Sequence, residues 1–82
     1  MQITFPVVLE TTEKYEKWHE SLDEQTKYFV ENRLYGLENG NIGQHRELGE
    51  GLFELKWESG IRVYCGRIDN RVVLLWGGSK SK

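Results

Sequence analysis

Two cationic side chains flank a short turn in the C-terminal half of the chain. The stretch FELKWESGIRVYCG, residues 53–66, alternates apolar and polar residues, breaks at ESG, and then alternates again. Lys56 precedes this break and Arg62 follows it. In an antiparallel hairpin the two side chains come within about 5–8 Å of each other on one face. Adjacent cations of this kind can hold a phosphate, which is the chemistry that the spacing suggests.

The period of two along a strand sorts the side chains of this hairpin between two faces. One face is apolar and belongs under helices, while the other is open and carries the cations. The predicted apolar set is Phe53, Leu55, Trp57, Ile61, Val63 and Cys65, and the predicted open set is Leu52, Glu54, Lys56, Arg62, Tyr64 and Gly66.

The paired cations also have a purely structural interpretation. Like charges side by side are unfavourable unless an anion lies between them. A bound phosphate can be that anion, but so can Glu54 on the same face, in a surface salt bridge worth at most about 1 kcal/mol. The spacing alone leaves both interpretations open.

Further candidates surround the hairpin. His45 and Arg46 lie in a Gly-rich segment before it, and a histidine there can exchange a proton near neutral pH. Trp76 closes the last predicted strand, either as a core residue or as a surface on which a base stacks. Lys80 and Lys82 in the tail add positive charge beyond the strand end, or are simply a basic terminus.

Charge and composition narrow the possible functions. The net charge is −2, yet residues 1–38 hold four Lys or Arg against eight Asp or Glu, and residues 39–82 hold seven against five. An anion site therefore belongs to the second half of the chain. Two histidines and an inward-facing Cys65 give no convincing set of metal ligands, and no nucleotide or cofactor motif is present.

The elements that must position these residues form an α+β domain. We predict a small antiparallel sheet, made of an N-terminal strand and a three-stranded C-terminal meander, packed against an antiparallel helix hairpin. Pro6 places the first strand at an edge or bends it. The predicted elements are a strand in 3–10, helices in 11–22 and 23–40, a loop in 39–51, and strands in 52–57, 61–67 and 71–76.

Length and hydropathy predict one domain covering residues 1–82. The sequence has no apolar run long enough to cross a bilayer and does not start like a signal peptide. One cysteine cannot form an internal disulfide. We therefore expect a cytoplasmic protein without a membrane partner.

Four short motifs in order resemble a known family. They are L-x-x-GN-x-G at the end of the second helix, LG-x-G-x-x-EL entering the meander, RVY, and VVLL-x-GG-x-K at the close. With this order of elements, the chain from Tyr15 onward resembles the RelE/ParE superfamily of toxins from bacterial toxin–antitoxin modules. The HigB-type "addiction module killer protein" branch is the most similar.

The resemblance implies a toxin neutralised by a cognate antitoxin protein. Many members cut mRNA on the ribosome without a metal or another cofactor, using the 2′-hydroxyl of the RNA as nucleophile and basic residues of the open sheet face. On the matching positions here, Lys56 is the implied base or phosphate clamp, Arg62 the phosphate clamp, and Lys80 the neighbour of the leaving group. Around these three residues we predict His45, Arg46, Tyr64, Trp76 and Lys82 as nucleic-acid-binding residues.

Two departures keep other functions open. Glu54 stands where some ribosome-dependent members carry a basic residue, and related chains continue past the GG-x-K close by roughly a helix, whereas this sequence stops at Lys82. The chain is therefore expected to lack a C-terminal helix. Both departures favour a non-catalytic toxin that binds DNA gyrase, as ParE relatives do. A third possibility is an inactive module that only binds an antitoxin.

Overall fold

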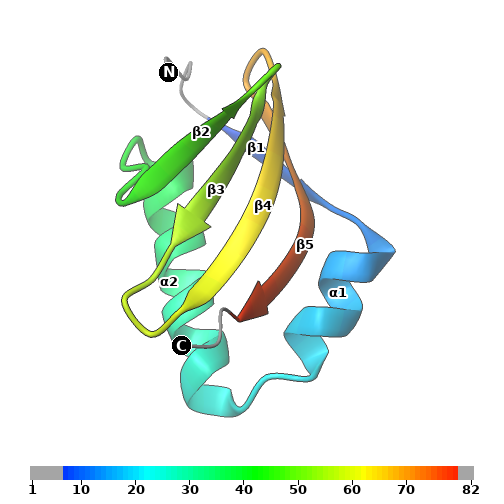
Figure 1. The fold of residues 1–82 in the computed structure, drawn as a ribbon, viewed down its shortest axis with the longest axis vertical. Helices are drawn as coiled ribbons and strands as arrows, with labels where there is room; N and C mark the ends of the chain where they lie inside the picture. The colour runs from blue at the N-terminus through cyan, green and yellow to red at the C-terminus, as the bar shows by residue number, and fades with distance from the viewer. Residues whose placement is uncertain (1–6, 80–82) are drawn as a thin grey trace.

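The computed structural model describes residues 7–79 and has the α+β fold that the sequence predicted. Two helices pack against one five-stranded sheet (Figure 1). The elements are β1 (Val8–Thr11), α1 (Glu13–Glu20), α2 (Glu24–Glu38), β2 (His45–Gly49), β3 (Leu52–Lys56), β4 (Ile61–Ile68) and β5 (Arg71–Ser79).

The sheet is mixed rather than wholly antiparallel. Its strand order is β1-β5-β4-β3-β2, and β1 pairs in parallel with β5 while every other pair is antiparallel. The predicted edge position of the first strand is confirmed, although Pro6 lies outside the described residues. An antiparallel neighbour is usually joined by a short hairpin turn, whereas parallel strands need a long connection. The helices and the other strands lie between β1 and β5 in the chain and provide that long connection.

Residues 45–49 form an edge strand where the sequence predicted a loop. Strand β2 is mostly exposed and lacks apolar alternation, which is why the sequence pattern did not predict it. It joins β3 through Glu50 and Gly51, both at positive φ, a backbone that suits a two-residue hairpin turn. A register shift between Glu47 and Gly49 marks a bulge in this pair.

Both helices begin at capping residues and turn one apolar stripe inward. The Thr12 hydroxyl accepts a hydrogen bond from the Tyr15 amide at 3.1 Å, and Asp23 caps α2 in the same manner. Tyr15 is buried, and Trp18 and Leu22, which follow it at the helical spacings i+3 and i+7, pack against the core. On α2 the buried stripe is Val30, Leu34 and Leu37, while Phe29 is half exposed.

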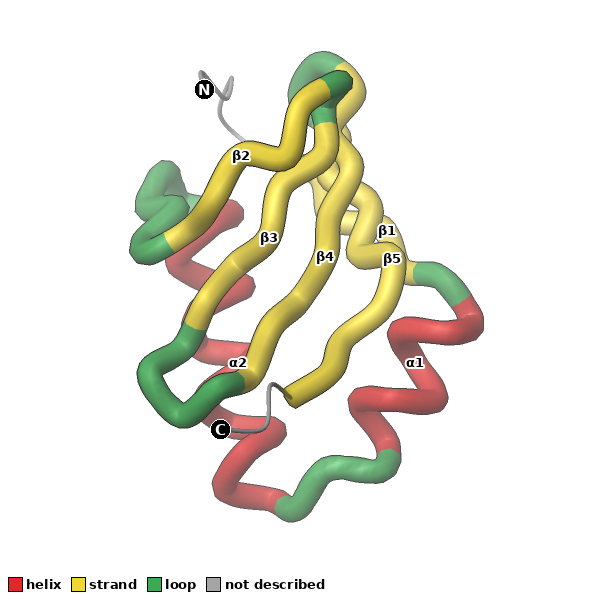
Figure 2. The backbone as a smooth tube through the Cα atoms, in the orientation of Figure 1, coloured by secondary structure: helices red, strands yellow, loops and turns green. Residues whose placement is uncertain are grey.

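The core lies between α2 and one face of the sheet, with α1 beside β5 (Figure 2). The two helices run in opposite directions along this layer (Figure 1). Within residues 7–79 no helix is long and apolar enough to span a bilayer. The buried core residues are Val7, Tyr15, Val30, Leu34, Leu37, Phe53, Leu55, Ile61, Val63, Cys65, Val72 and Leu74.

Candidate functional site

The sheet face that points away from α2 carries Lys56 and Arg62 as direct cross-strand partners. Strand pairing aligns Lys56 with Arg62 on β4 and Arg62 with Gly78 on β5. This confirms the predicted strand parity, because Phe53, Leu55 and Val63 lie on the buried face. We call Lys56, Arg62 and Gly78 the cation row.

The Arg62 side chain is oriented by its own turn. One terminal guanidinium nitrogen donates to the carbonyl oxygens of Trp57 at 3.1 Å and Ile61 at 2.9 Å. Its Nε is buried and has no hydrogen-bond partner among the described residues. The guanidinium is thus held by the backbone of the β3–β4 turn, which fixes its direction before any anion arrives.

Lys56 is half buried, and its ammonium has no ion pair or hydrogen bond within the described part of the chain. Neither Lys56 nor Arg62 forms an ion pair with Glu54 there. The purely structural interpretation of the pair as a Glu54 salt bridge is therefore not realised. Two adjacent cations with no anion from residues 7–79 between them are an arrangement that can hold an external anion.

A second row lies two residues along the strands, about 6.8 Å from the cation row. It aligns Arg46, Glu54, Tyr64 and Trp76 across β2, β3, β4 and β5. The Tyr64 and Trp76 rings stack with centroids 5.0 Å apart and an interplanar angle of 29°. Glu54 is only 4% exposed although it belongs to the open set. Arg46 is exposed at the end of this row.

Trp76 is 42% exposed and is not a core residue. Strict alternation after the buried Val72 and Leu74 would turn Trp76 inward. The β4–β5 register shifts at this point, pairing Cys65 with Leu74 but Tyr64 with Trp76, so that Leu75 is an extra residue on β5. Such a bulge re-aims the side chains that follow it.

The bulge also changes which face of the sheet Gly77 and Gly78 lie on. Gly77 and Gly78 continue β5 to Ser79 instead of ending the strand at Trp76. Gly77 now faces the helix side, where a Cβ atom would lie 2.3–2.5 Å from the Trp18 ring. Gly78 faces the open side beside Arg62, and a Cβ there would meet no atom of residues 7–79 within 4 Å. Among the described residues, none therefore crowds the cation row at Gly78.

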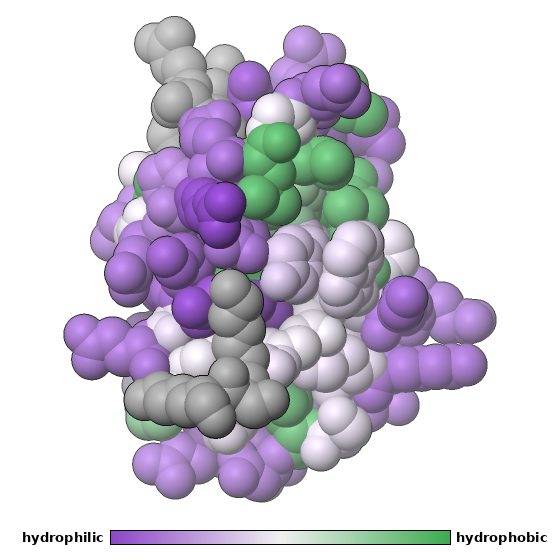
Figure 3. All heavy atoms as spheres, in the orientation of Figure 1, coloured by the Kyte–Doolittle hydropathy of each residue, from purple (hydrophilic) through white to green (hydrophobic). Residues whose placement is uncertain are grey.

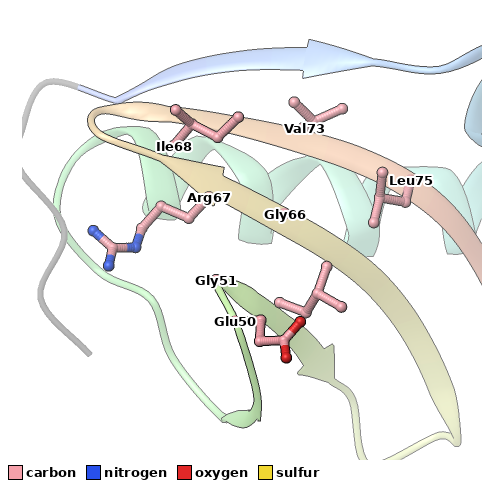
Figure 4. A pocket seen from close by; sticks show the side chains of 8 residues that line it. Glu50, Gly51, Gly66, Arg67, Ile68, Val73 and Leu75 are labelled. Carbon is pink, nitrogen blue, oxygen red and sulfur yellow. The ribbon is translucent and has the colours of Figure 1, made fainter.

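The far end of the same face is largely apolar. A groove of about 270 Å³ lies there; its lining includes Gly66, Ile68, Val73 and Leu75, together with the polar Glu50 and Arg67 (Figure 4). Apolar side chains gather at this end of the face, residues of intermediate hydropathy cover its middle, and polar ones lie mainly along its two flanks (Figure 3). The open face thus changes from cationic through aromatic to apolar along the strands.

Of the remaining predicted residues, His45 is not brought to the cation row. His45 aligns with the buried Leu55, meets the Phe53 ring edge-on at 6.5 Å, and places Nδ1 3.0 Å from the Gly43 carbonyl oxygen. It therefore lies on the helix side of β2. Lys80 and Lys82 lie outside the described residues.

Other titratable groups do not assemble a second centre on the described part of the chain. Within residues 7–79, no three His, Cys, Asp or Glu side chains converge as they would around a metal ion. Cys65 is fully buried, and burial raises the pKa of its thiol to about 12. A thiol with that pKa stays protonated and packs as an apolar group.

Sequence reasoning missed Arg33, which supports the site from behind. Its guanidinium donates to the backbone carbonyl oxygens of Lys56 at 2.8 Å and Gln44 at 2.7 Å, and it lies 4.6 Å from the centre of the Trp57 ring. Burial lowers the pKa of Arg33. Arg33 fixes the backbone at the end of β3, where Lys56 begins the turn. A lone arginine on a helix gives no sequence signal for such a role.

This sheet, with its helix pair on one face and a cationic open face, is the fold of RelE toxins. The isolated E. coli RelE toxin superposes with a TM-score of 0.76 at 20% identity, over 93% of this chain and 86% of that one. The toxin–antitoxin complex RelBE2 from Mycobacterium tuberculosis gives 0.78 at 17% identity, over 100% of both chains. The intact E. coli RelBE complex gives 0.75 at 21% identity, over 93% and 99%.

A sequence relative shows the family. An uncharacterized protein of Haemophilus influenzae is 32% identical over 79 residues, which span 92% of this chain and 80% of that protein. The chain belongs to the same family as this protein. No protein-family model matches the sequence. Membership of the HigB-type branch stays a prediction.

Proposed function

We propose that this protein is the toxin of a type II toxin–antitoxin module and acts as a metal-independent mRNA endoribonuclease. The observation that carries the proposal is the cation row on the open face of a RelE-like sheet, with no protein anion between Lys56 and Arg62 in the described residues. We propose that Lys56 and Arg62 together bind one phosphodiester group of the RNA.

The chemistry that this row supports is internal transfer of the RNA phosphate. The 2′-hydroxyl oxygen attacks the adjacent phosphorus, the bond to the 5′-oxygen breaks, and the products are a 2′,3′-cyclic phosphate and a 5′-hydroxyl end. Arg62, oriented by the turn carbonyls, stabilises the charge that builds on the phosphoryl oxygens. Lys56 neutralises the same oxygens or, as a neutral amine, takes the proton of the 2′-hydroxyl. Lys80 is the proposed donor to the leaving oxygen.

The proposed partners follow from the same reasoning. The E. coli RelBE and M. tuberculosis RelBE2 structures are toxins bound to antitoxins, and we propose a cognate antitoxin for this chain as well. We further propose that mRNA is cut on the ribosome, in the cytoplasm. Arg46 and the aromatic pair extend the contact surface beyond the reacting phosphate.

The test is growth arrest and RNA end mapping after induction without antitoxin. The double variant Lys56→Ala/Arg62→Ala is expected to grow normally and to leave transcripts uncut. Lys17→Ala is the matched control, since Lys17 is an exposed cation of α1 paired only with Glu13 in the described structure. New 5′-hydroxyl ends in the wild type and control, and none in the double variant, support the mechanism. Full toxicity of the double variant contradicts it.

One observation favours a second candidate function. The buried carboxylate of Glu54 lies one row from the cations and weakens the positive field there. A toxin that inhibits DNA gyrase by binding does not need that field. Induction would then cause DNA damage with intact transcripts, whereas an inactive antitoxin-binding module would cause neither.

A further inference from the structure

The second row of the open face presents a large aromatic surface beside the phosphate site. Trp76 is 42% exposed and stacks on Tyr64. The Lys14 ammonium of α1 lies 5.5 Å from the centre of the Trp76 ring. An exposed indole stacked on a second ring, with a cation over it, has the composition of surfaces that bind single-stranded nucleic acid.

The backbone is built to hold Trp76 in this place. The Leu75 bulge turns Trp76 outward, and the hydroxyl of Thr12 anchors that bulge by donating to the Leu75 carbonyl oxygen at 2.6 Å. The Thr12 amide donates to the Leu74 carbonyl oxygen at 3.2 Å. The same residue caps the helix that carries Lys14, so the indole and its cation are fixed to one anchor.

The charges decide which part of a nucleotide fits each row. The cation row suits a phosphate, but Glu54 in the second row repels one. The Tyr64–Trp76 pair lies about 6.8 Å from the cation row, on the scale of a single nucleotide, and Trp76 is 42% exposed. A nucleotide with its phosphate between Lys56 and Arg62 can therefore extend its base toward the stacked rings.

We infer that Tyr64 and Trp76 form a stacking platform for one unpaired nucleobase of single-stranded RNA, next to the phosphate held by the cation row. The inference rests on the proposed ribonuclease function and narrows its substrate. A base in a duplex cannot reach the platform, so double-stranded RNA is excluded. Stacking depends on ring area rather than on hydrogen-bond pattern, so purines bind more tightly than pyrimidines.

The experiment measures binding of the full chain to a short single-stranded RNA with 2′-O-methyl groups throughout, which cannot be cleaved. Fluorescence anisotropy gives the affinity, and a single abasic site is moved along the oligonucleotide. Trp76→Leu should weaken binding about 5- to 150-fold, the range for loss of one stacked base. Trp76→Phe should retain most of the affinity, which separates lost stacking from misfolding.

The decisive result is non-additivity. An abasic site at the stacked position should weaken binding of the wild type as much as Trp76→Leu does, and should have no further effect on Trp76→Leu. Tyr35→Leu is the matched control, because Tyr35 is an aromatic residue of α2 that is 66% exposed. Its affinity should equal that of the wild type.

Failure of this inference can be told from failure of the proposed function. If the wild type does not bind the RNA, or if Trp76→Leu binds as tightly as the wild type, the platform does not exist. Cleaved transcripts in cells would then still support the ribonuclease. Conversely, platform-dependent binding without cleaved transcripts would sustain the platform and refute the catalytic proposal. If Trp76→Leu loses only antitoxin affinity, the platform serves a protein and the inference is wrong.

Discussion

Replacing Gly77 by alanine tests how closely α1 packs on the end of β5. An ideal Cβ on Gly77 would lie 2.3 Å from Cε3 and 2.4 Å from Cζ3 of Trp18, whereas carbon atoms in contact prefer about 3.5–4.0 Å. The indole would have to withdraw by more than about 1 Å. It cannot do so freely, because the indole packs against the core and against the Tyr15 ring, with the two ring centroids 5.7 Å apart.

We expect Gly77→Ala to lower the free energy of unfolding by about 1–3 kcal/mol, the usual cost of overpacking. Alanine also restricts the unfolded chain, which offsets about 0.4–1 kcal/mol of this loss. Domains of this kind are stable by about 5–15 kcal/mol, so the change is readily measured. The urea midpoint should fall with an unchanged m value, and Tm should fall by about 4–8 °C for each kcal/mol.

The adjacent Gly78 supplies the control. It lies in the same strand, but on the open face where a Cβ would meet no atom of the described residues within 4 Å. Gly78→Ala should leave the midpoint unchanged or raise it slightly. Truncating Trp18 to leucine should remove most of the penalty of Gly77→Ala, because the two residues are coupled by direct contact. Equal midpoints for Gly77→Ala and Gly78→Ala would refute this packing argument.

Three further predictions concern the supports of the site. Arg33→Met should lower the free energy of unfolding in urea by about 1.5–3 kcal/mol, since it leaves the Lys56 and Gln44 carbonyl oxygens without their charged donor. An unchanged urea midpoint would contradict this role. Thr12→Val should lower the free energy of unfolding by about 0.5–2 kcal/mol, measured by thermal unfolding, because α1 loses its cap. Thr12→Ser keeps a capping hydroxyl and should retain most of the wild-type stability. Burial raises the pKa of Cys65 to about 12, so only the unfolded state ionises above pH ~8.5. Stability should therefore fall by about 1.4 kcal/mol between pH 7 and 9.5, and this contribution should vanish in Cys65→Val; an identical pH slope in both proteins would disprove it.

The sequence by itself determined the centre of the site. The apolar alternation on each side of the ESG turn fixes which face of β3 and β4 is buried, because a shift of one residue would expose Phe53 and Leu55. Pairing of Lys56 with Arg62 follows from that register and the turn length. The helix stripes and a threonine cap at residue 11 or 12 were predictable from local spacing and capping chemistry, and the structure selects Thr12.

Only the tertiary structure decided how the rest of the face is built. Strand β2 forms because β3 offers it an open edge, although its own residues carry no strand pattern, and this pairing turns His45 to the helix side. The Leu75 bulge depends on the match between β4, β5 and the Thr12 anchor, and it alone turns Trp76 outward and Gly77 toward Trp18. A bulge adds one residue to one strand of a pair, so its position is set by the fit between partners distant in the chain, which local periodicity does not record.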